Sequence, residues 1–527
     1  MRRLGLAVTL TWLAAFQSGP AQPASPAQQT GAATLQELRQ QLAAQLADSR
    51  FAAAVFGVKV VSLDTGKTLF EHDAAKLLSP ASNCKLFTMA LALDRLGGNY
   101  RIQTSLYASA RPTRSGTLKG DLIIYGRGDP SFNARRHGGD IFAALDRLVT
   151  ALTNAGVRRI QGDVIGDDSF FQGPPYGSGW SWDDMQYYYG AEISALSIND
   201  NALELSVSPG PHVGAPCRLS LKPDTRYLLL SNRTTTVAHG LKRVLHLYRP
   251  IEHNVLYVTG QMPLDDKPFT ETVTVHQPAG LFAEWFREAL LRRGVRVRGR
   301  ARAVGWLERQ TRPLDTARLV ELATVESPPL RELVREVQKP SQNLYTDLIL
   351  AHIGERERAR RATAGAADAA PSFRTSEELG VDALETFLAR VGIARNEARF
   401  EEGSGLSRNN LATPNAIIQL LQFMDRHAEA EAWRDALPIA GVDGTLRNRM
   451  KDTPAAGNVR AKTGTLRWAN ALSGYLTSAA GERLAFALVL NRYVPPDAER
   501  TARAEIDKIT VALAAFRGRS DEGSAGR

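Results

Sequence analysis

Short stretches rich in apolar residues, bounded by polar and turn-forming positions, lie near both ends of this chain. These stretches predict five strands: residues 55–61, 68–70, 458–466, 471–478 and 483–491. A turn at Asp64-Thr65-Gly66 joins the first two as a hairpin. Helical spacing of the apolar positions predicts amphipathic helices at 35–47 and 500–516. We therefore expect one sheet that is built from both ends of the chain, with one helix at each end.

Two further helices are predicted between these ends. Ser79 can cap the first of them, Pro80 suits its first position, and a Gly-Gly pair ends it. Residues 344–353 form the second helix, which Gly354 stops, and an Arg/Ala-rich loop follows at 356–371. Both helices would lie on the helical side of the sheet.

The middle of the chain has the pattern of an insertion. Residues 100–132 are rich in predicted strands, and the helices at 140–155 and 280–293 are each followed by a turn and a short strand. Between these two units, short strands and turns dominate residues 170–275. The chain is therefore divided into a sheet-forming domain at 28–97 and 321–517, inserted domains at 98–320 with a β-rich domain nested at about 170–275, and a tail at 518–527.

The N-terminus, residues 1–27, has the pattern of a secretory signal. Arg2 and Arg3 precede a mostly apolar stretch at 4–16, and small and polar residues follow at 18–27. The apolar stretch is short for a bilayer-spanning helix, so an exported and cleaved protein is favoured over one with a retained anchor. No later segment of the sequence is apolar enough to cross a membrane.

Composition adds two constraints. The net charge of +10 favours anionic partners such as cell-wall polymers, membrane surfaces or nucleic acid. The charges are scattered, however, and no basic helix carries interleaved aromatic residues, so we expect no nucleic-acid partner. Cys84 and Cys217 are too few for a disulfide framework, and we predict that both are free, although an oxidising compartment would permit a bridge.

Two short sequence motifs contain the candidate catalytic residues. Ser82 and Lys85 stand three positions apart, which places both on one face of a helix. The lysine can then take the proton of the serine and make it a nucleophile. Lys462-Thr463-Gly464, placed on a strand, can line the opposite wall of a cleft and bind a carboxylate. Together the two words predict a penicillin-reactive serine enzyme.

The third expected word, S-x-N, occurs four times in the sequence. Context favours Ser341 and Asn343, because they follow Pro340, open a predicted helix and lie outside the insertion. Ser407 and Asn409 remain the rival pair, since they too open a region ahead of the K-T-G strand.

These groups would support acyl transfer. Ser82 would attack a carbonyl carbon, and Lys85 would act as its base once burial and a nearby cation, such as Lys462, had lowered the pKa of its amino group. Ser341 can relay a proton between Lys85 and the leaving nitrogen. Asn343 can hold the amide of the substrate.

The other wall of the cleft would bind the end of the substrate. Lys462, Thr463 and Thr465 suit a terminal carboxylate. The backbone N–H groups of Ser82 and Thr465 can form an oxyanion hole, which is worth about 3 kcal/mol per donor. The aromatic and acidic segment 180–184 can touch a substrate side chain, or can simply pack a loop. Motifs for a metal or a phosphate are missing from the sequence, so we expect no metal and no organic cofactor.

At these residues the chain resembles the exported D-alanyl-D-alanine carboxypeptidase/endopeptidases, which are low-molecular-mass penicillin-binding proteins with nested inserted domains. Three further words support the resemblance: residues 125–130, 403–408 and 441–446. Glu402 departs from the family pattern, in which an aspartate is common, and we expect no loss of activity from this. The 403–408 word also explains why Ser407 is the weaker S-x-N choice.

The resemblance implies an α+β protein with a β-lactamase/transpeptidase-like catalytic domain, in which helices flank an antiparallel sheet. It implies a periplasmic enzyme that removes the terminal D-alanine of peptidoglycan stem peptides or cleaves D-alanyl cross-links, and that β-lactams acylate at Ser82. Two alternatives stay open: a β-lactamase or esterase on the same scaffold, and a non-catalytic peptidoglycan-binding protein.

Overall fold

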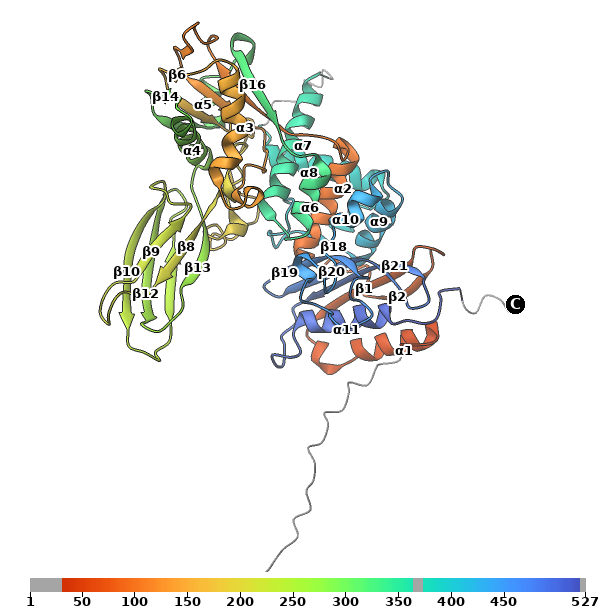
Figure 1. Ribbon diagram of the computed structural model, residues 1–527. Coiled ribbons are helices and arrows are strands. Elements are labelled where there is room, and N and C mark those ends of the chain that lie inside the picture. The colour runs from red at the N-terminus through yellow and green to blue at the C-terminus, as the bar shows by residue number, and fades with distance from the viewer. Residues whose placement is uncertain (1–30, 364–372, 522–527) are drawn as a thin grey trace, which may run out of the picture.

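The computed structural model describes residues 31–363 and 373–521. Its main sheet has five antiparallel strands in the order β19-β20-β21-β1-β2. These strands are β1 (Val55–Ser62), β2 (Thr68–His72), β19 (Arg460–Leu466), β20 (Ala469–Thr477) and β21 (Arg483–Asn491). Because β1 pairs with β21 along its whole length, the two ends of the chain share one sheet, as the strands predicted at both ends suggest (Figure 1).

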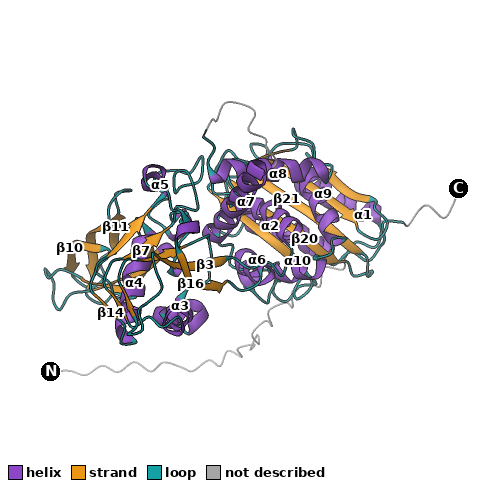
Figure 2. Cartoon of the chain, turned by 90° about the horizontal axis from the view of Figure 1, so that it is seen from above, coloured by secondary structure: helices purple, strands orange, loops and turns teal. Residues whose placement is uncertain are grey.

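Helices cover both faces of this sheet (Figures 1 and 2). On β21, Phe486 and Leu488 pack with α1 (Leu35–Leu46) and α11 (Ala502–Ala514). The alternate residues Ala487 and Val489 face the core of the helical side. The helices of that side are α2 (Cys84–Leu96), α6 (Leu330–Gln338), α7 (Asn343–Thr363), α8 (Ser376–Arg390), α9 (Pro414–Asp425) and α10 (Ala430–Ala436). The protein is therefore α+β, with an antiparallel sheet flanked by helices.

The insertion contributes a second five-stranded sheet in the order β15-β7-β5-β3-β16 and a small sheet in the order β14-β6-β4. Its helices α3 (Ile141–Asn154) and α4 (Pro278–Arg292) each lead into a short strand and then a strand of the larger sheet. Both pairs of equivalent strands are parallel neighbours, so the helix–turn–strand unit occurs twice, side by side. The strands are β3 (Gln103–Ala108), β4 (Thr117–Leu118), β5 (Leu122–Tyr125), β6 (Arg159–Ile160), β7 (Val164–Asp167), β14 (Arg296–Val297), β15 (Ala301–Val304) and β16 (Val320–Glu326).

Two three-stranded sheets, β13-β8-β9 and β10-β12-β11, stand between the two units. Their strands are β8 (Ala202–Ser208), β9 (Arg218–Lys222), β10 (Leu229–Val237), β11 (Val244–Tyr248), β12 (Val255–Pro263) and β13 (Phe269–Thr274). The first of them begins only at Ala202, and residues 170–201 form loops and short 3-10 turns. These loops reach the helical side, where the N–H of Ser376 donates to the carbonyl of Gln172 at 2.7 Å.

Short elements complete the described chain: α5 (Trp306–Thr311), β17 (Ala398–Arg399) and β18 (Leu411–Ala412). The predicted signal at 1–27 lies outside the described residues. Within residues 31–363 and 373–521, no helix combines the length and apolarity that a membrane crossing needs. Cys84 and Cys217 are both free and buried, which confirms that they do not form a bridge.

The predicted start of the first inner helix is wrong. The turn before α2 is a 3-10 helix, η2 (Ala81–Asn83), and Pro80 precedes it rather than opening the helix. Ser79 does not cap it, because its buried Oγ has no hydrogen-bond partner in the described chain and its N–H donates to Asn491. Ala81 adopts a positive φ of 47°, a conformation that L-residues rarely take, directly before Ser82.

The predicted stop at Gly354 is also wrong, because α7 continues through it to Thr363. A Cβ atom on Gly354 would lie 1.9 Å from the carbonyl oxygen of Ser376 on α8. The glycine therefore lets two helices pack closely and does not end one. Residues 364–371 of the predicted loop lie outside the described chain.

Replacing Gly354 with alanine tests this packing. Helix propensity alone would stabilise the protein by about 1 kcal/mol, whereas the clash with α8 should destabilise it by about 1–3 kcal/mol. Urea unfolding followed by circular dichroism measures the sign of the change. A variant more stable than the wild type would show that α7 and α8 do not need this close approach.

Candidate active site

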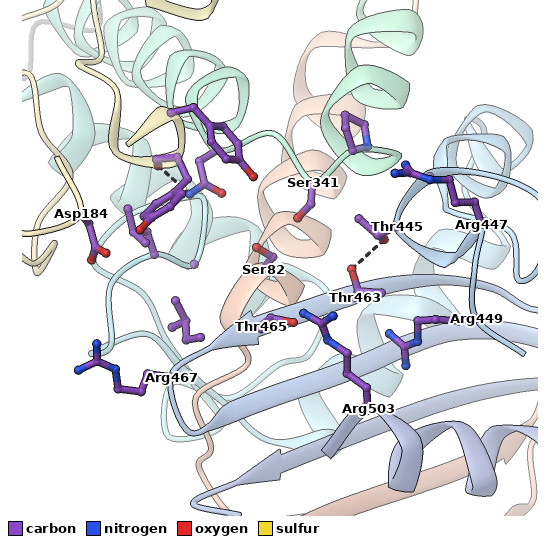
Figure 3. A pocket seen from close by; sticks show the side chains of 18 of the residues that line it. Ser82, Asp184, Ser341, Thr445, Arg447, Arg449, Thr463, Thr465, Arg467 and Arg503 are labelled. Carbon is purple, nitrogen blue, oxygen red and sulfur yellow. Dashed lines mark hydrogen bonds between the residues drawn. The ribbon is translucent and has the colours of Figure 1, made fainter. Parts of the chain in front are cut away.

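A cavity of about 630 Å³ lies where the sheet, the helical side and the insertion meet. Ser82 of η2 and Ser341, just before α7, point into it (Figure 3). Thr463 and Thr465 of β19 form the opposite wall, and Tyr189 of η4 (Tyr188–Gly190) comes from the insertion. Segments that are far apart in the sequence thus converge on one cavity. This is what the prediction of a cleft between the S-x-x-K and K-T-G motifs requires.

Lys85 is completely buried behind Ser82. Its Nζ lies 2.9 Å from the Oγ of Ser82, 2.6 Å from the Oδ1 of Asn343 and 2.6 Å from the carbonyl oxygen of Ser404. A neutral amine can donate two hydrogen bonds, to Asn343 and Ser404, and point its lone pair at the Ser82 hydroxyl. The geometry therefore suits a base that removes the serine proton.

Lys462 is the second completely buried lysine. Its Nζ lies 2.7 Å from the Oγ of Ser341 and 2.9 Å from the carbonyl oxygen of Thr463. Ser341 holds a positive φ of 67°, which is unusual for a serine and is a common sign of a functional position. The amino group of Lys462 thus fixes a hydroxyl group at the cavity, while the amino group itself stays behind the wall.

Burial lowers the pKa of both amino groups. It lowers the pKa of Lys85 to about 8, against the charges of Asp347 and Glu402, which raise it. Burial also lowers the pKa of Lys462 well below its usual value, and the charge of Lys85 lowers it further. Burial is therefore the cause that we predicted for Lys85. The predicted help from Lys462 is wrong, because burial alone lowers the pKa of Lys85 and the charges that act on it, those of Asp347, Glu402 and Cys84, all raise it.

Two glycines allow the walls to come together. A Cβ atom on Gly464 would lie 2.5 Å from the carbonyl oxygen of Pro80, and one on Gly405 would lie 2.0 Å from that of Ala81. Gly464 is buried and packs β19 against the turn that carries Ser82. It therefore shapes the site by close packing and does not line the cavity. The side chain of Asn83 anchors the same turn to β20 by donating to Ser473 Oγ at 2.7 Å.

The structure distinguishes the two S-x-N candidates. Ser341 and Asn343 bond to the two buried lysines. The hydroxyl of Ser407 instead donates to Glu401 at 3.2 Å, and the amide of Asn409 donates to the same carboxylate at 2.9 Å. The insertion supports the first pair, since the Nδ2 of Asn343 donates to the carbonyl of Tyr189 at 2.8 Å.

Several groups around the cavity were not found from the sequence. The Ser404 carbonyl is a backbone atom, and no side-chain pattern could reveal it. Thr445, which follows the first residue of η7 (Gly444–Leu446), bonds to Thr463 through their hydroxyl groups at 2.8 Å. Ser404 and Thr445 lie in the motifs at 403–408 and 441–446, which support the family resemblance. Those motifs were the signal that could have identified them. Five arginines also line the cavity: Arg408, Arg447, Arg449, Arg467 and Arg503.

Known proteins resemble this chain along most of its length. It is 36% identical to the D-alanyl-D-alanine carboxypeptidase of Actinomadura sp. (strain R39) over 507 residues, which cover 94% of this chain and 88% of that protein. It is 26% identical to D-alanyl-D-alanine carboxypeptidase DacB of Haemophilus influenzae over 454 residues, 84% of this chain and 87% of the relative.

The crystal structure of penicillin binding protein 4 from Haemophilus influenzae superposes with a TM-score of 0.75 at 24% identity, covering 90% of this chain and 98% of that one. Fold and cavity together define a serine enzyme with a β-lactamase/transpeptidase-like sheet. The chain belongs to the D-Ala-D-Ala carboxypeptidase 3 (S13) family, whose model matches residues 38–513. It is thus a serine-type carboxypeptidase, which confirms the resemblance drawn from the sequence.

The two S-x-N serines form a matched pair for mutation. Ser341→Ala removes the hydroxyl that Lys462 holds at the cavity, and it should lower turnover of a D-Ala-D-Ala peptide by about 10²- to 10⁴-fold. Ser407→Ala removes a hydroxyl that bonds only within its own loop and should retain most of the turnover. Steady-state kinetics of both variants decides the matter, and the reverse ranking would contradict this geometry.

Proposed function

We propose that this protein is an exported serine D,D-peptidase that cleaves D-Ala-D-Ala termini and D-alanyl cross-links of peptidoglycan through an acyl-enzyme on Ser82. The observation that carries the proposal is the 2.9 Å contact between Lys85 Nζ and Ser82 Oγ, with two further acceptors around the same buried amine. Export rests on the pattern of residues 1–27 and on a substrate that lies outside the cytoplasm.

Acylation follows from these contacts. Lys85 takes the proton of Ser82, and Oγ bonds to the carbonyl carbon of the scissile amide. The backbone N–H groups of Ser82 and Thr465 hold the oxyanion. As the C–N bond breaks, the hydroxyl of Ser341 gives a proton to the leaving nitrogen and recovers one through the buried amines. The leaving amine departs as D-alanine or as the amine of a cross-linked peptide.

Deacylation uses the same base. Water loses a proton to Lys85 while its oxygen attacks the ester carbonyl of the acyl-enzyme. The C–Oγ bond then breaks, and Ser82 recovers the proton from Lys85. A β-lactam would follow the first half of this route and stay attached to Ser82, because its cleaved ring nitrogen remains tethered to the acyl group.

The two walls suit the two ends of such a substrate. The hydroxyl groups of Thr445, Thr463 and Thr465 line the side on which a terminal carboxylate would bind. Asp184 lies on the other side, where the side chain of a stem peptide would lie (Figure 3), and the tyrosines of η4 also line the cavity. This position supports the reading of segment 180–184 as a substrate contact.

Mass spectrometry after benzylpenicillin treatment tests the acyl-enzyme. An adduct on the peptide that contains Ser82 is expected, and Lys85→Ala should abolish it because the base is lost. Ser407→Ala should still be labelled. An adduct on another residue, or none at any concentration, would contradict the proposed nucleophile. Rapid release of hydrolysed penicillin, without turnover of D-Ala-D-Ala peptides, would instead identify a β-lactamase.

The pKa of Lys85 predicts the pH dependence of acylation. The neutral amine is the active form, and burial lowers its pKa to about 8, so the second-order rate of acylation should rise with pH and level off above that value. Stopped-flow measurement with a chromogenic β-lactam between pH 5 and about 10 gives the midpoint. A rate that falls with increasing pH over this range would rule out Lys85 as the base.

A further inference from the structure

The cavity around Ser82 is strongly basic. Five arginines line it, whereas Asp184 is its single carboxylate among the lining residues. Lys462 of the K-T-G motif is the lysine expected to supply a positive charge to this site. It is buried, however, and its pKa is lowered well below the usual value. The positive charge that a substrate meets in the cavity therefore comes from the arginines.

The arginines do not surround Ser82 evenly. Arg467 lies on the same side as Asp184, whereas Arg447 and Arg449 lie beyond Thr463 and Arg503 ends between Thr465 and Thr463, on the carboxylate side (Figure 3). These three come from two separate segments. Arg447 and Arg449 follow η7, and Arg503 belongs to the first turn of α11. The fold therefore brings two segments together to place guanidinium groups on this side.

Arg449 already has a partner, because it lies 2.6 Å from Asp507. Arg447 and Arg503 are exposed, and neither side chain has a hydrogen bond or ion pair within residues 31–363 and 373–521. Both guanidinium groups line the same cavity, so both are available to bind an anion there. A carboxylate is a ligand that their planar donors can bind in bidentate fashion.

We infer that Arg447 and Arg503 form a binding site for a second carboxylate, carried by the leaving group of the substrate. This inference rests on the proposed function, which places the first carboxylate at Thr463 and Thr465. A single D-alanine has no charge beyond that point. The leaving strand of a cross-linked stem peptide continues past it and carries further carboxylates. The site therefore favours anionic leaving peptides over D-alanine alone.

Paired substrates with one acyl part and different leaving groups test the site. The leaving groups are D-glutamate and D-2-aminoadipate, each compared with its side-chain amide, which has the same shape and no charge. In the wild type the better acid should exceed its amide in kcat/KM by about tenfold, the range of a pair of charge-assisted hydrogen bonds. In Arg447→Gln/Arg503→Gln this ratio should approach one.

Arg111→Gln/Arg114→Gln is the matched control, since it removes the same charge from two exposed positions of the insertion that do not line the cavity. It should leave both the ratio and the turnover of D-Ala-D-Ala unchanged. Salt offers a readout that needs no variant. Raising NaCl to about 1 M should lower the acid-to-amide ratio of the wild type toward one, because exposed charges are screened.

The outcomes separate this inference from the proposed function. Equal kcat/KM for acid and amide in the wild type, with D-Ala-D-Ala hydrolysed normally, would overturn the second carboxylate site alone. A ratio that survives in the double variant would do the same. No hydrolysis of any of these peptides, with no adduct on Ser82, would overturn both.

Discussion

Burial of two lysine amino groups behind one cavity is the constraint on which this structure depends. Removing an amine from water favours its neutral form, so burial is what suits Lys85 to act as a base and what lowers the pKa of Lys462 well below its usual value. A buried amine also needs hydrogen-bond partners, and their directions are fixed by the protein. Ser82 and Ser341 serve as two of those partners. The same contacts that satisfy the lysines therefore position the two hydroxyl groups.

The partners of the two lysines come from distant parts of the chain, and the fold brings them together. Lys85 lies on α2 near the N-terminus and Lys462 on β19 near the C-terminus, and the sheet that joins both ends brings them together. Close approach at Gly464 and Gly405 leaves no room for side chains between the walls. The insertion takes part as well, since its Tyr189 carbonyl holds the amide of Asn343.

Local features were predictable from the sequence. Short apolar stretches bounded by turn residues identified the five strands of the main sheet, and the three-residue spacing of Ser82 and Lys85 placed both on one face. Features that depend on contacts between distant segments were not predictable. Gly354 resembles a helix stop until the close passage of α8 is known, and the charge of Lys462 depends on burial that no local pattern records. The exposed arginines lie in unrelated segments, so only the fold reveals that they share a cavity.

Different residues thus provide the two functions of the site. The buried lysines provide acid–base chemistry, and the arginines that line the cavity provide its positive charge. Nuclear magnetic resonance of isotopically labelled lysine side chains, with the Lys85 signal assigned through a Lys85→Arg variant, measures the basis of this division directly. Titration of Lys85 with a pKa near 8 is predicted, with the pKa of Lys462 also well below its ordinary value. Titration of both amino groups near the ordinary value of 10.5 would contradict the account.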